Sequence, residues 1–297
     1  MELRVLRYFL AVAREENITA AANSLHVTQP TLSKQLKDLE EELGKKLFTR
    51  GNRKITLTEE GIFLRKRAQE ITDLVDKTEA EFQTDDENLA GDIYIGGGET
   101  RVFRHLARTF ARLHGLYPNI RLNLYSGNGE DVSERLNKGL IDFGLFVGTT
   151  DLKDYDYLVM PEADTWGLIM RKDDPLASHE SITPEDLYGI PLLVSRQAMI
   201  RNELSGWMGY SFDKLNVIGT YNLIYNASVM VEEGLGSAIS IDKLVNTTGD
   251  SDLCFRPFAP AMRADLIIAW KKYQVFSRAA EKFLEVLQEE LAAPDKI

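Results

Sequence analysis

A cluster of side chains that can form hydrogen bonds lies near the amino terminus, between residues 28 and 34. Its hydroxyl, amide and ammonium groups belong to Thr28, Gln29, Thr31, Ser33 and Lys34, and Pro30 stands among them. Such groups can bind base edges in a DNA major groove, where Gln suits adenine. At the start of a helix, the cluster would have the position of a recognition helix, whose N-terminal residues meet the bases. The alternative is an ordinary pair of helices with a polar outer face.

The apolar residues around this cluster predict the helices that would position it. Thr28 can cap a helix that has Pro30 in its first turn. Its buried stripe would be formed by Leu32, Leu36, Leu39 and Leu43, at steps of four, three and four. A shorter helix precedes it, capped by Asn17 or Thr19, with an apolar face of Ala21, Ala22 and Leu25. Residues 3–15 predict a further helix, with an apolar face of Leu3, Leu6, Phe9, Leu10 and Ala13.

Three cations gather in the next segment, residues 47–58. Alternation through Lys54-Ile55-Thr56-Leu57 predicts a strand, and Gly51-Asn52 predicts a hairpin turn. The cations are Arg50, Arg53 and Lys54, near the hairpin tip. Beside a recognition helix they could grip phosphate or the minor groove. The alternative is a solvated loop.

The order of these motifs resembles the N-terminal domain of the LysR-type transcriptional regulators. The resemblance covers residues 1 to about 61 and rests on Thr28-Gln29-Pro30-Thr31-Leu32-Ser33, Leu39-Glu40, Leu43-Gly44, Leu47-Phe48, Arg50 and Leu57-Thr58-Glu59-Glu60-Gly61. It implies a winged helix-turn-helix over residues 1–61 that binds double-stranded DNA as a dimer. It further implies tetramers through paired effector domains, and RNA polymerase as another partner.

A long helix is predicted from Thr58 to about Asp86. Its periodic positions alternate between steps of four and three, at Leu57, Gly61, Leu64, Ala68, Ile71, Val75, Thr78 and Phe82. This period is typical of a coiled coil, so we expect Leu64, Ala68, Ile71, Val75 and Phe82 to lie between two chains. The alternative is an amphipathic helix packed on its own domain. As a coiled coil, residues 58–90 would form a linker and dimerisation helix followed by a polar hinge.

From Gly91 onward, two sets of strands alternate with helices, which predicts mainly parallel sheets with helices on both faces. We expect residues 91–297 to form a two-lobed domain, with lobe 1 over 91–163 and 268–297 and lobe 2 over 164–267. Segments Ala163–Met170 and Ala264–Trp270 would be strands that cross between the lobes. The layout, with Gly139-Leu140-Ile141-Asp142 among its landmarks, resembles the effector domain of the same family and type 2 periplasmic binding proteins. The expected fold class is α/β, with an all-α winged helix-turn-helix before the linker helix.

Ligands of open α/β sheets bind beyond the carboxyl ends of the strands, so two facing lobes predict one cleft. The candidate lining residues are Glu99, Thr100, Ser126, Asn128, Phe146, Ser195, Arg196, Asn222 and Tyr225. Thr100 and Asn222 stand near helix starts, which favour a carboxylate, and Arg196 could clamp one. Glu99 argues against a simple dianion and allows a ligand with an amine. For each residue the alternative is an ordinary polar group of a surface loop.

The family resemblance adds a small-molecule effector to this cleft and matches Thr100 to a recurrent Ser/Thr effector contact. Two other functions compete with a regulator, namely a solute-binding protein or an enzyme built on the same two-lobed domain. The N-terminal motif argues against both, because neither needs a helix-turn-helix.

Charge is distributed unevenly along the chain, which has a net charge of −11. Residues 1–58 hold 10 Lys and Arg against 7 Asp and Glu, a net of +3, and the remainder holds 25 against 39, a net of −14. Basic charge therefore lies where phosphates would be met.

Several other classes of protein and site are excluded by composition. The single cysteine, Cys254, cannot form an internal disulfide and fits a reducing cytosol, so we expect a cytoplasmic protein. No run of 18 apolar residues could span a membrane, and Arg4, Arg7 and Arg14 interrupt any signal sequence. The histidines lack metal-ligand spacing, and no nucleophile elbow is present. We therefore expect no enzymatic activity, no metal and no cofactor.

Overall fold

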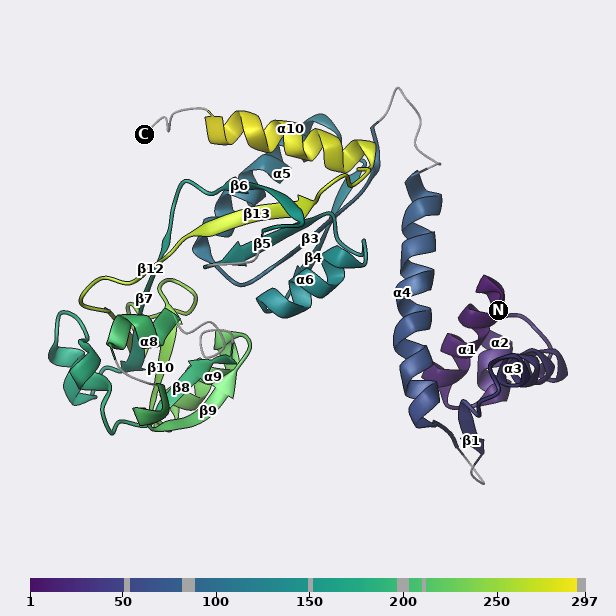
Figure 1. The fold of residues 1–297 in the computed structure, drawn as a ribbon, viewed down its shortest axis with the longest axis horizontal. Coiled ribbons are helices and arrows are strands. Elements are labelled where there is room, and N and C mark those ends of the chain that lie inside the picture. The colour runs from purple at the N-terminus through teal and green to yellow at the C-terminus, as the bar shows by residue number, and fades with distance from the viewer. Residues whose placement is uncertain (51–53, 82–88, 149–151, 197–202, 210–211, 293–297) are drawn as a thin grey trace. The chain divides into compact units, whose positions relative to one another are not determined.

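The computed structural model describes residues 1–50, 54–81, 89–148, 152–196, 203–209 and 212–292. The chain divides into two compact units, Met1–Gln83 and Thr84–Ile297 (Figure 1). We call them the N-terminal unit and the C-terminal unit and describe each by itself. Within the described ranges, no helix is long and apolar enough to cross a membrane.

Three helices form the core of the N-terminal unit, namely α1 (Leu3–Glu15), α2 (Ile18–Ser24) and α3 (Gln29–Leu43). Local hydrogen bonds fix where α2 and α3 begin. The Asn17 side chain accepts the N–H of Ala20 at 3.0 Å, and the Thr28 hydroxyl accepts the N–H of Thr31 at 3.4 Å. In the turn between them, His26 adopts the left-handed region at φ 55°. The predicted helices, caps and turn are confirmed.

Two of the predicted apolar faces were wrong in detail. On α3, Leu32, Leu36 and Leu39 are buried, but Leu43 in the last turn is 40% exposed. On α1, the buried residues are Val5, Leu6, Phe9, Ala11 and Val12. Leu3 and Ala13 are only half-buried. The buried face is broader than the predicted stripe because α1 contacts three other helices, α2, α3 and α4 (Glu59–Glu81).

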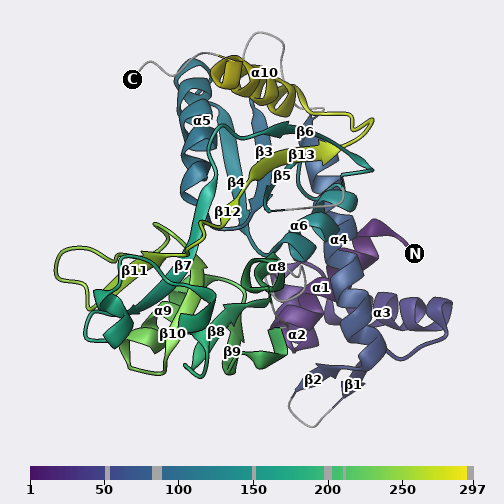
Figure 2. The same ribbon diagram turned by 60° about the vertical axis from the view of Figure 1, so that its left-hand side comes forward.

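A hairpin follows α3, as the sequence predicts. Strands β1 (Phe48–Arg50) and β2 (Ile55–Leu57) pair antiparallel, and the hydroxyls of Thr49 and Thr56 are 2.9 Å apart. Figure 2 shows the hairpin extending beyond the helices of its unit.

The Glu40 carboxylate ties the hairpin to α3. It accepts the N–H groups of Leu47 at 2.8 Å and Phe48 at 3.3 Å, and the Lys46 ammonium at 2.8 Å. Burial opposes ionisation of Glu40, but these hydrogen bonds outweigh it, so the pKa of the carboxyl lies below its usual value. Glu40 is therefore a negatively charged anchor for the start of the hairpin.

We expect Glu40→Ala to lower the free energy of unfolding by roughly 1–3 kcal/mol, because two backbone N–H groups lose their acceptor. Because its folded pKa is lowered, the Glu40 contribution is complete above the ordinary carboxyl pKa of 4.5 and disappears as the pH falls through the folded value. Urea unfolding, with hydrogen exchange of N-terminal peptides as the local readout, measures both effects. The control is Glu41→Ala, which removes an exposed pair with Lys37 (3.2 Å) and should cost under about 1 kcal/mol. Equal losses in the two variants would contradict the anchor.

Helix α4 begins after Thr58, whose hydroxyl accepts the Gly61 N–H at 3.0 Å and donates to the Lys46 carbonyl at 2.7 Å. The helix lies close to the hairpin, because a Cβ on Gly61 would be 2.1 Å from the Leu47 carbonyl oxygen. Glycine is therefore required where α4 passes the hairpin.

The residues of the predicted inter-chain seam differ in how far they are buried within their own unit, and their role between chains stays a prediction. Leu64 and Ala68 are 8% and 0% exposed, because they pack into the core of their own unit against α1. Ile71 is 39% exposed and Val75 is half-buried, whereas Phe82 lies outside the described residues. Phe63 and Leu74, which the heptad pattern did not include, are 65% and 43% exposed.

The C-terminal unit contains two sheets, and the first defines lobe 1. Its strand order is β4-β3-β5-β13-β6, formed by β3 (Gly91–Gly97), β4 (Ile120–Ser126), β5 (Phe143–Val147), β6 (Tyr155–Val159) and β13 (Leu266–Lys271). Strand β3 is parallel to β4 and β5, whereas β13 is antiparallel to β5 and β6. Helices α5 (Arg104–Leu116) and α10 (Arg278–Ala292) cover one face, and α6 (Gly129–Asn137) covers the other (Figure 1). Strand β6 was not predicted.

The second sheet defines lobe 2 and has the order β11-β7-β10-β8-β9. Its strands are β7 (Asp164–Arg171), β8 (Leu192–Ser195), β9 (Val217–Tyr221), β10 (Ser237–Ile241) and β11 (Leu253–Pro257), and β12 (Arg263–Ala264) pairs with β7. Strands β10, β8 and β9 are parallel, whereas β7 runs antiparallel to β10 and β11. Its helices include α8 (Glu203–Met208) and α9 (Ile224–Glu232).

The chain crosses between the lobes in two short segments, not in long strands as predicted. Strand β7 lies wholly in the lobe 2 sheet and β13 wholly in the lobe 1 sheet. The crossings are therefore residues 160–163 and Asp265. Lobe 1 resumes at Leu266, two residues before the expected boundary.

Candidate functional site

The polar cluster predicted from the sequence lies at the start of α3. Thr28, Gln29, Pro30, Thr31 and Lys34 are exposed. Ser33 is half-buried. The hydroxyls of Thr28 and Thr31 are 2.8 Å apart, and the Gln29 amide donates to the Ser33 hydroxyl at 3.1 Å. These contacts join only side chains three or four residues apart at the start of α3. The start of α3 thus presents donors, acceptors and a cation on an open surface.

The structure describes the three hairpin cations unequally. Lys54 is exposed and forms an ion pair with Glu16, just after α1. The Ile55 N–H also donates to the Glu16 carbonyl at 3.0 Å, so the hairpin is fastened to the end of α1. For Arg50 the structure describes only the strand backbone, and Arg53 lies outside the described residues.

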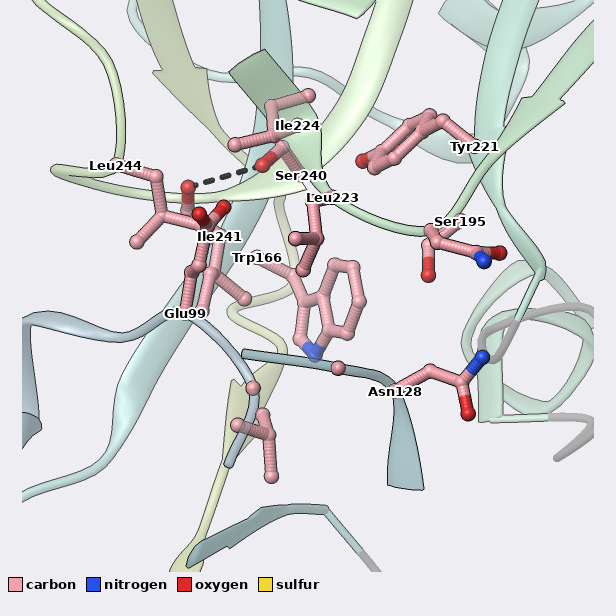
Figure 3. A pocket seen from close by; sticks show the side chains of 14 residues that line it. Glu99, Asn128, Trp166, Ser195, Tyr221, Leu223, Ile224, Ser240, Ile241 and Leu244 are labelled. Atoms are coloured by element: carbon pink, nitrogen blue, oxygen red, sulfur yellow. Dashed lines mark hydrogen bonds between the residues drawn. The ribbon is translucent and has the colours of Figure 1, made fainter. Parts of the chain in front are cut away.

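A pocket lies between the two lobes of the C-terminal unit (Figure 3). Lobe 1 contributes the residues at and beyond the ends of β3, β4 and β5, which are Gly98, Glu99, Gly127, Asn128 and Val147. Lobe 2 contributes Trp166, Ser195, Tyr221, Asn222, Leu223, Ile224, Ser240, Ile241 and Leu244. A second hollow shares Gly98, Glu99 and Leu244 with this pocket and is also lined by Thr100, Ser126 and Lys243.

The predicted cleft residues divide into three groups. Glu99, Asn128, Ser195 and Asn222 line the pocket, and Thr100 and Ser126 line the second hollow. Arg196 and Tyr225 are exposed, and neither lines the pocket or the hollow. Phe146 is 1% exposed and packs in the lobe 1 core with Tyr155. Because side chains alternate along a strand, its neighbour Val147 faces the pocket instead.

Trp166 is the main lining residue that the sequence did not indicate. It stands beside Ile241 in the antiparallel pair of β7 and β10. An antiparallel strand brings its amino end to the edge where parallel strands have their carboxyl ends, so the rule used for the sequence did not reach it. The rule does include Tyr221 at the end of β9, and it also reaches Ile241 at the end of β10.

Several polar groups of the pocket are already used by the fold. The Tyr221 hydroxyl donates to the Ile239 carbonyl at 2.5 Å, and burial raises its pKa well above the usual range, so it stays neutral. Ser240 donates to the Ile241 carbonyl at 3.2 Å. The Asn128 side chain caps α6 by accepting the N–H groups of Glu130 at 2.9 Å and Asp131 at 3.0 Å. These side chains shape the pocket and keep few hydrogen-bonding groups for a ligand.

Thr100 is also engaged within the protein. Its hydroxyl accepts the Val102 N–H at 3.0 Å and contacts the Asp164 carboxyl. Burial raises the pKa of Asp164, and the contact with Thr100 offsets part of that increase. The role of Thr100 as an effector contact stays a prediction, and the residue is 8% exposed.

Two family models match this chain, one over the N-terminal helices and one over the C-terminal unit. Residues 3–62 match the bacterial regulatory helix-turn-helix protein, lysR family, and residues 86–292 match the LysR substrate binding domain. The Hca operon transcriptional activator HcaR of Escherichia coli (strain K12) is 29% identical over 302 aligned positions, covering 99% of each chain. The regulator BsdA of Bacillus subtilis (strain 168) is 33% identical over 199 positions, covering 66% of this chain and 67% of BsdA.

Solved structures show the same fold. Full-length CbnR complexed with its target DNA superposes with a TM-score of 0.74 at 19% identity, covering 97% of this chain and 99% of CbnR. A second crystal structure of CbnR, a LysR family transcriptional regulator, superposes with a TM-score of 0.75 at 18% identity, covering 99% of this chain and 100% of CbnR. Since the two matched domains account for most of the chain, it belongs to the LysR family of transcriptional regulators.

Proposed function

We propose that this chain is a sequence-specific regulator of transcription in which an effector bound between the lobes changes how α3 engages DNA. The observation that carries the proposal is the open polar start of α3 in the same chain as an interlobe pocket. The relatives named as transcriptional regulators, and CbnR with its target DNA, support it.

On DNA, the start of α3 would enter the major groove. Thr28, Gln29, Pro30, Thr31, Ser33 and Lys34 would lie near base edges. Arg50, Arg53 and Lys54 of the hairpin would contact the DNA backbone. Lys54 would exchange its ion pair with Glu16 for a phosphate.

The effector would be a small molecule in the pocket. Glu99, Asn128, Ser195 and Asn222, together with Trp166, are the side chains best placed to contact it. Two short crossings between the lobes permit closure without unfolding either core, and a ligand that prefers one lobe arrangement shifts that equilibrium.

Self-association would occur through α4, with pairing of C-terminal units giving a tetramer. Phe63, Ile71 and Leu74 are exposed apolar residues on α4, and Leu124 of β4 and Val229 of α9 are 57% and 41% exposed on the C-terminal unit. RNA polymerase is a further proposed partner. We propose no enzymatic role, and a cytoplasmic location, since DNA is the target.

Selection from a random DNA library with the full-length chain tests this function. We expect enrichment of an inverted repeat whose half-sites lie about one helical turn, or a multiple of it, apart. If the selected pool remains random in sequence, the proposal of sequence-specific DNA binding is wrong.

A further inference from the structure

The pocket combines one unpaired carboxylate with one unpaired buried donor. Of the described residues that line it, Glu99 is the single charged one, and it forms no ion pair or hydrogen bond with any described residue. Lys243, in the second hollow, instead lies 3.8 Å from Asp242. The Glu99 carboxylate is therefore available to a cation of the ligand.

Trp166 supplies the donor. Its side chain stands in the middle of the pocket (Figure 3), the residue is 9% exposed, and its indole nitrogen has no hydrogen-bond partner among the described residues. A buried donor without an acceptor is costly, so a ligand that brings an acceptor relieves that cost.

The helix starts at the pocket give a second site for an acceptor. At α6 and at the 3-10 turn Arg101–Phe103, side-chain oxygens of the caps Asn128 and Thr100 accept hydrogen bonds from the first backbone N–H groups. At α9 the N-cap is Leu223, which has no side-chain oxygen, and Asn222 through Ile224 line the pocket. The α9 start is thus open to a ligand carboxylate.

Part of the remaining lining is apolar. Five aliphatic residues, Val147, Leu223, Ile224, Ile241 and Leu244, line the pocket together with the polar side chains of Asn128, Ser195, Tyr221, Asn222 and Ser240. The pocket volume is about 80 Å³, and the neighbouring second hollow, which is also lined by Arg101 and Lys243, measures about 360 Å³. The site therefore suits a compact ligand with one cationic group, one anionic group and an apolar body.

Resting on the proposed function, we propose that the effector is a zwitterionic amino acid with an apolar side chain. Its ammonium group pairs with Glu99, its carboxylate takes the donors of the α9 start and Trp166, and its side chain lies against the apolar walls. A simple carboxylate would leave Glu99 facing an anion without compensation.

Calorimetry on the full-length chain with six compounds tests this assignment. The zwitterions are L-leucine and L-phenylalanine. Their deaminated partners are 4-methylpentanoate and 3-phenylpropanoate, and their decarboxylated partners are 3-methylbutylamine and 2-phenylethylamine. We expect at least one amino acid to bind with a dissociation constant below about 1 mM, and both of its truncated partners to bind at least about tenfold more weakly.

Two substitutions assign the charges. Glu99→Gln should weaken amino-acid binding at least about tenfold and leave or improve binding of the deaminated acid. Trp166→Phe keeps the ring and should weaken the amino acid and the acid alike. Glu130→Gln, an exposed residue of α6 outside the pocket lining, is the matched control and should change neither affinity.

The assignment is overturned if a deaminated acid binds as tightly as its amino acid, if Glu99→Gln leaves amino-acid affinity unchanged, or if none of the six compounds binds below about 1 mM. Gel shifts on the same preparation keep this outcome separate from the function itself. Retained sequence-specific DNA binding would leave the regulator standing with a different effector, whereas its absence would count against the proposed function.

Discussion

A full-length chain carrying Ile71→Lys and Leu74→Lys is expected to sediment as a smaller species and to lose DNA affinity by about 100-fold or more. Both side chains lie with Phe63 on one exposed stripe of α4, and the Arg67 guanidinium covers the Phe63 ring at 5.6 Å. A second chain on this stripe would bury the introduced ammonium groups without partners, which is strongly unfavourable. A monomer engages one half-site and loses the advantage of a linked second contact.

Sedimentation velocity and gel shifts on one operator measure the two effects. Gln69→Lys is the control, because it adds one such ammonium group, where the double variant adds two, at an exposed position on another face of α4. We expect it to leave the assembly intact. If the double variant sediments like the unaltered chain, the stripe is not the interface.

Removing the Gln29 amide is the second change with a large expected effect. Gln29→Ala should cost roughly 1–3 kcal/mol on the preferred operator and relax the preference at a single base pair, because Gln can bind adenine at two points. Lys54→Ala should instead weaken all duplexes alike. If Lys54 neutralises one phosphate, its loss should reduce the slope of log affinity against log salt by about 0.9.

Fluorescence anisotropy across salt concentrations, on specific and scrambled duplexes, separates the two roles. Lys282→Ala is the control for net charge, because Lys282 lies in the C-terminal unit and pairs with Glu285 at 2.6 Å. It should change neither preference nor slope. An unaltered base preference in the Gln29→Ala variant would contradict a contact between Gln29 and a base edge.

The helix-turn-helix could be predicted residue by residue because its signals are local. The Asn17 and Thr28 caps, Pro30 in the first turn and the leucine spacing each act within a few residues of where they stand. Tertiary packing decides the rest, and Leu43 shows it, since it keeps the leucine period yet remains 40% exposed.

The heptad pattern of α4 could not tell an inter-chain seam from an intra-chain one. Either kind of seam needs apolar residues on one face of the helix. Here α1 packs against that face at Leu64 and Ala68. The surface left for a partner is therefore displaced toward Phe63 and Leu74, which fall outside the strict repeat.

The sequence predicted those lining residues of the pocket that stand at the carboxyl ends of parallel strands. It missed the lining residue of the antiparallel strand β7. Glu99, Asn128 and Ser195 follow the ends of strands that run parallel, so the rule for carboxyl ends brought them together. Trp166 lies inside the apolar run of β7, and only the antiparallel pairing with β10 brings it to the same edge. No local signal marks that pairing.

Reciprocal coupling between effector and operator is the central claim, and paired titrations measure it most directly. The affinity of the full-length chain for its selected operator is measured with and without a saturating ligand of the interlobe pocket, and the ligand affinity is measured with and without operator. We expect each to change the other by the same factor, roughly 5- to 150-fold, accompanied by an altered footprint. Unchanged affinities in both directions together with an unchanged footprint would contradict the account, because such a ligand could not regulate DNA binding.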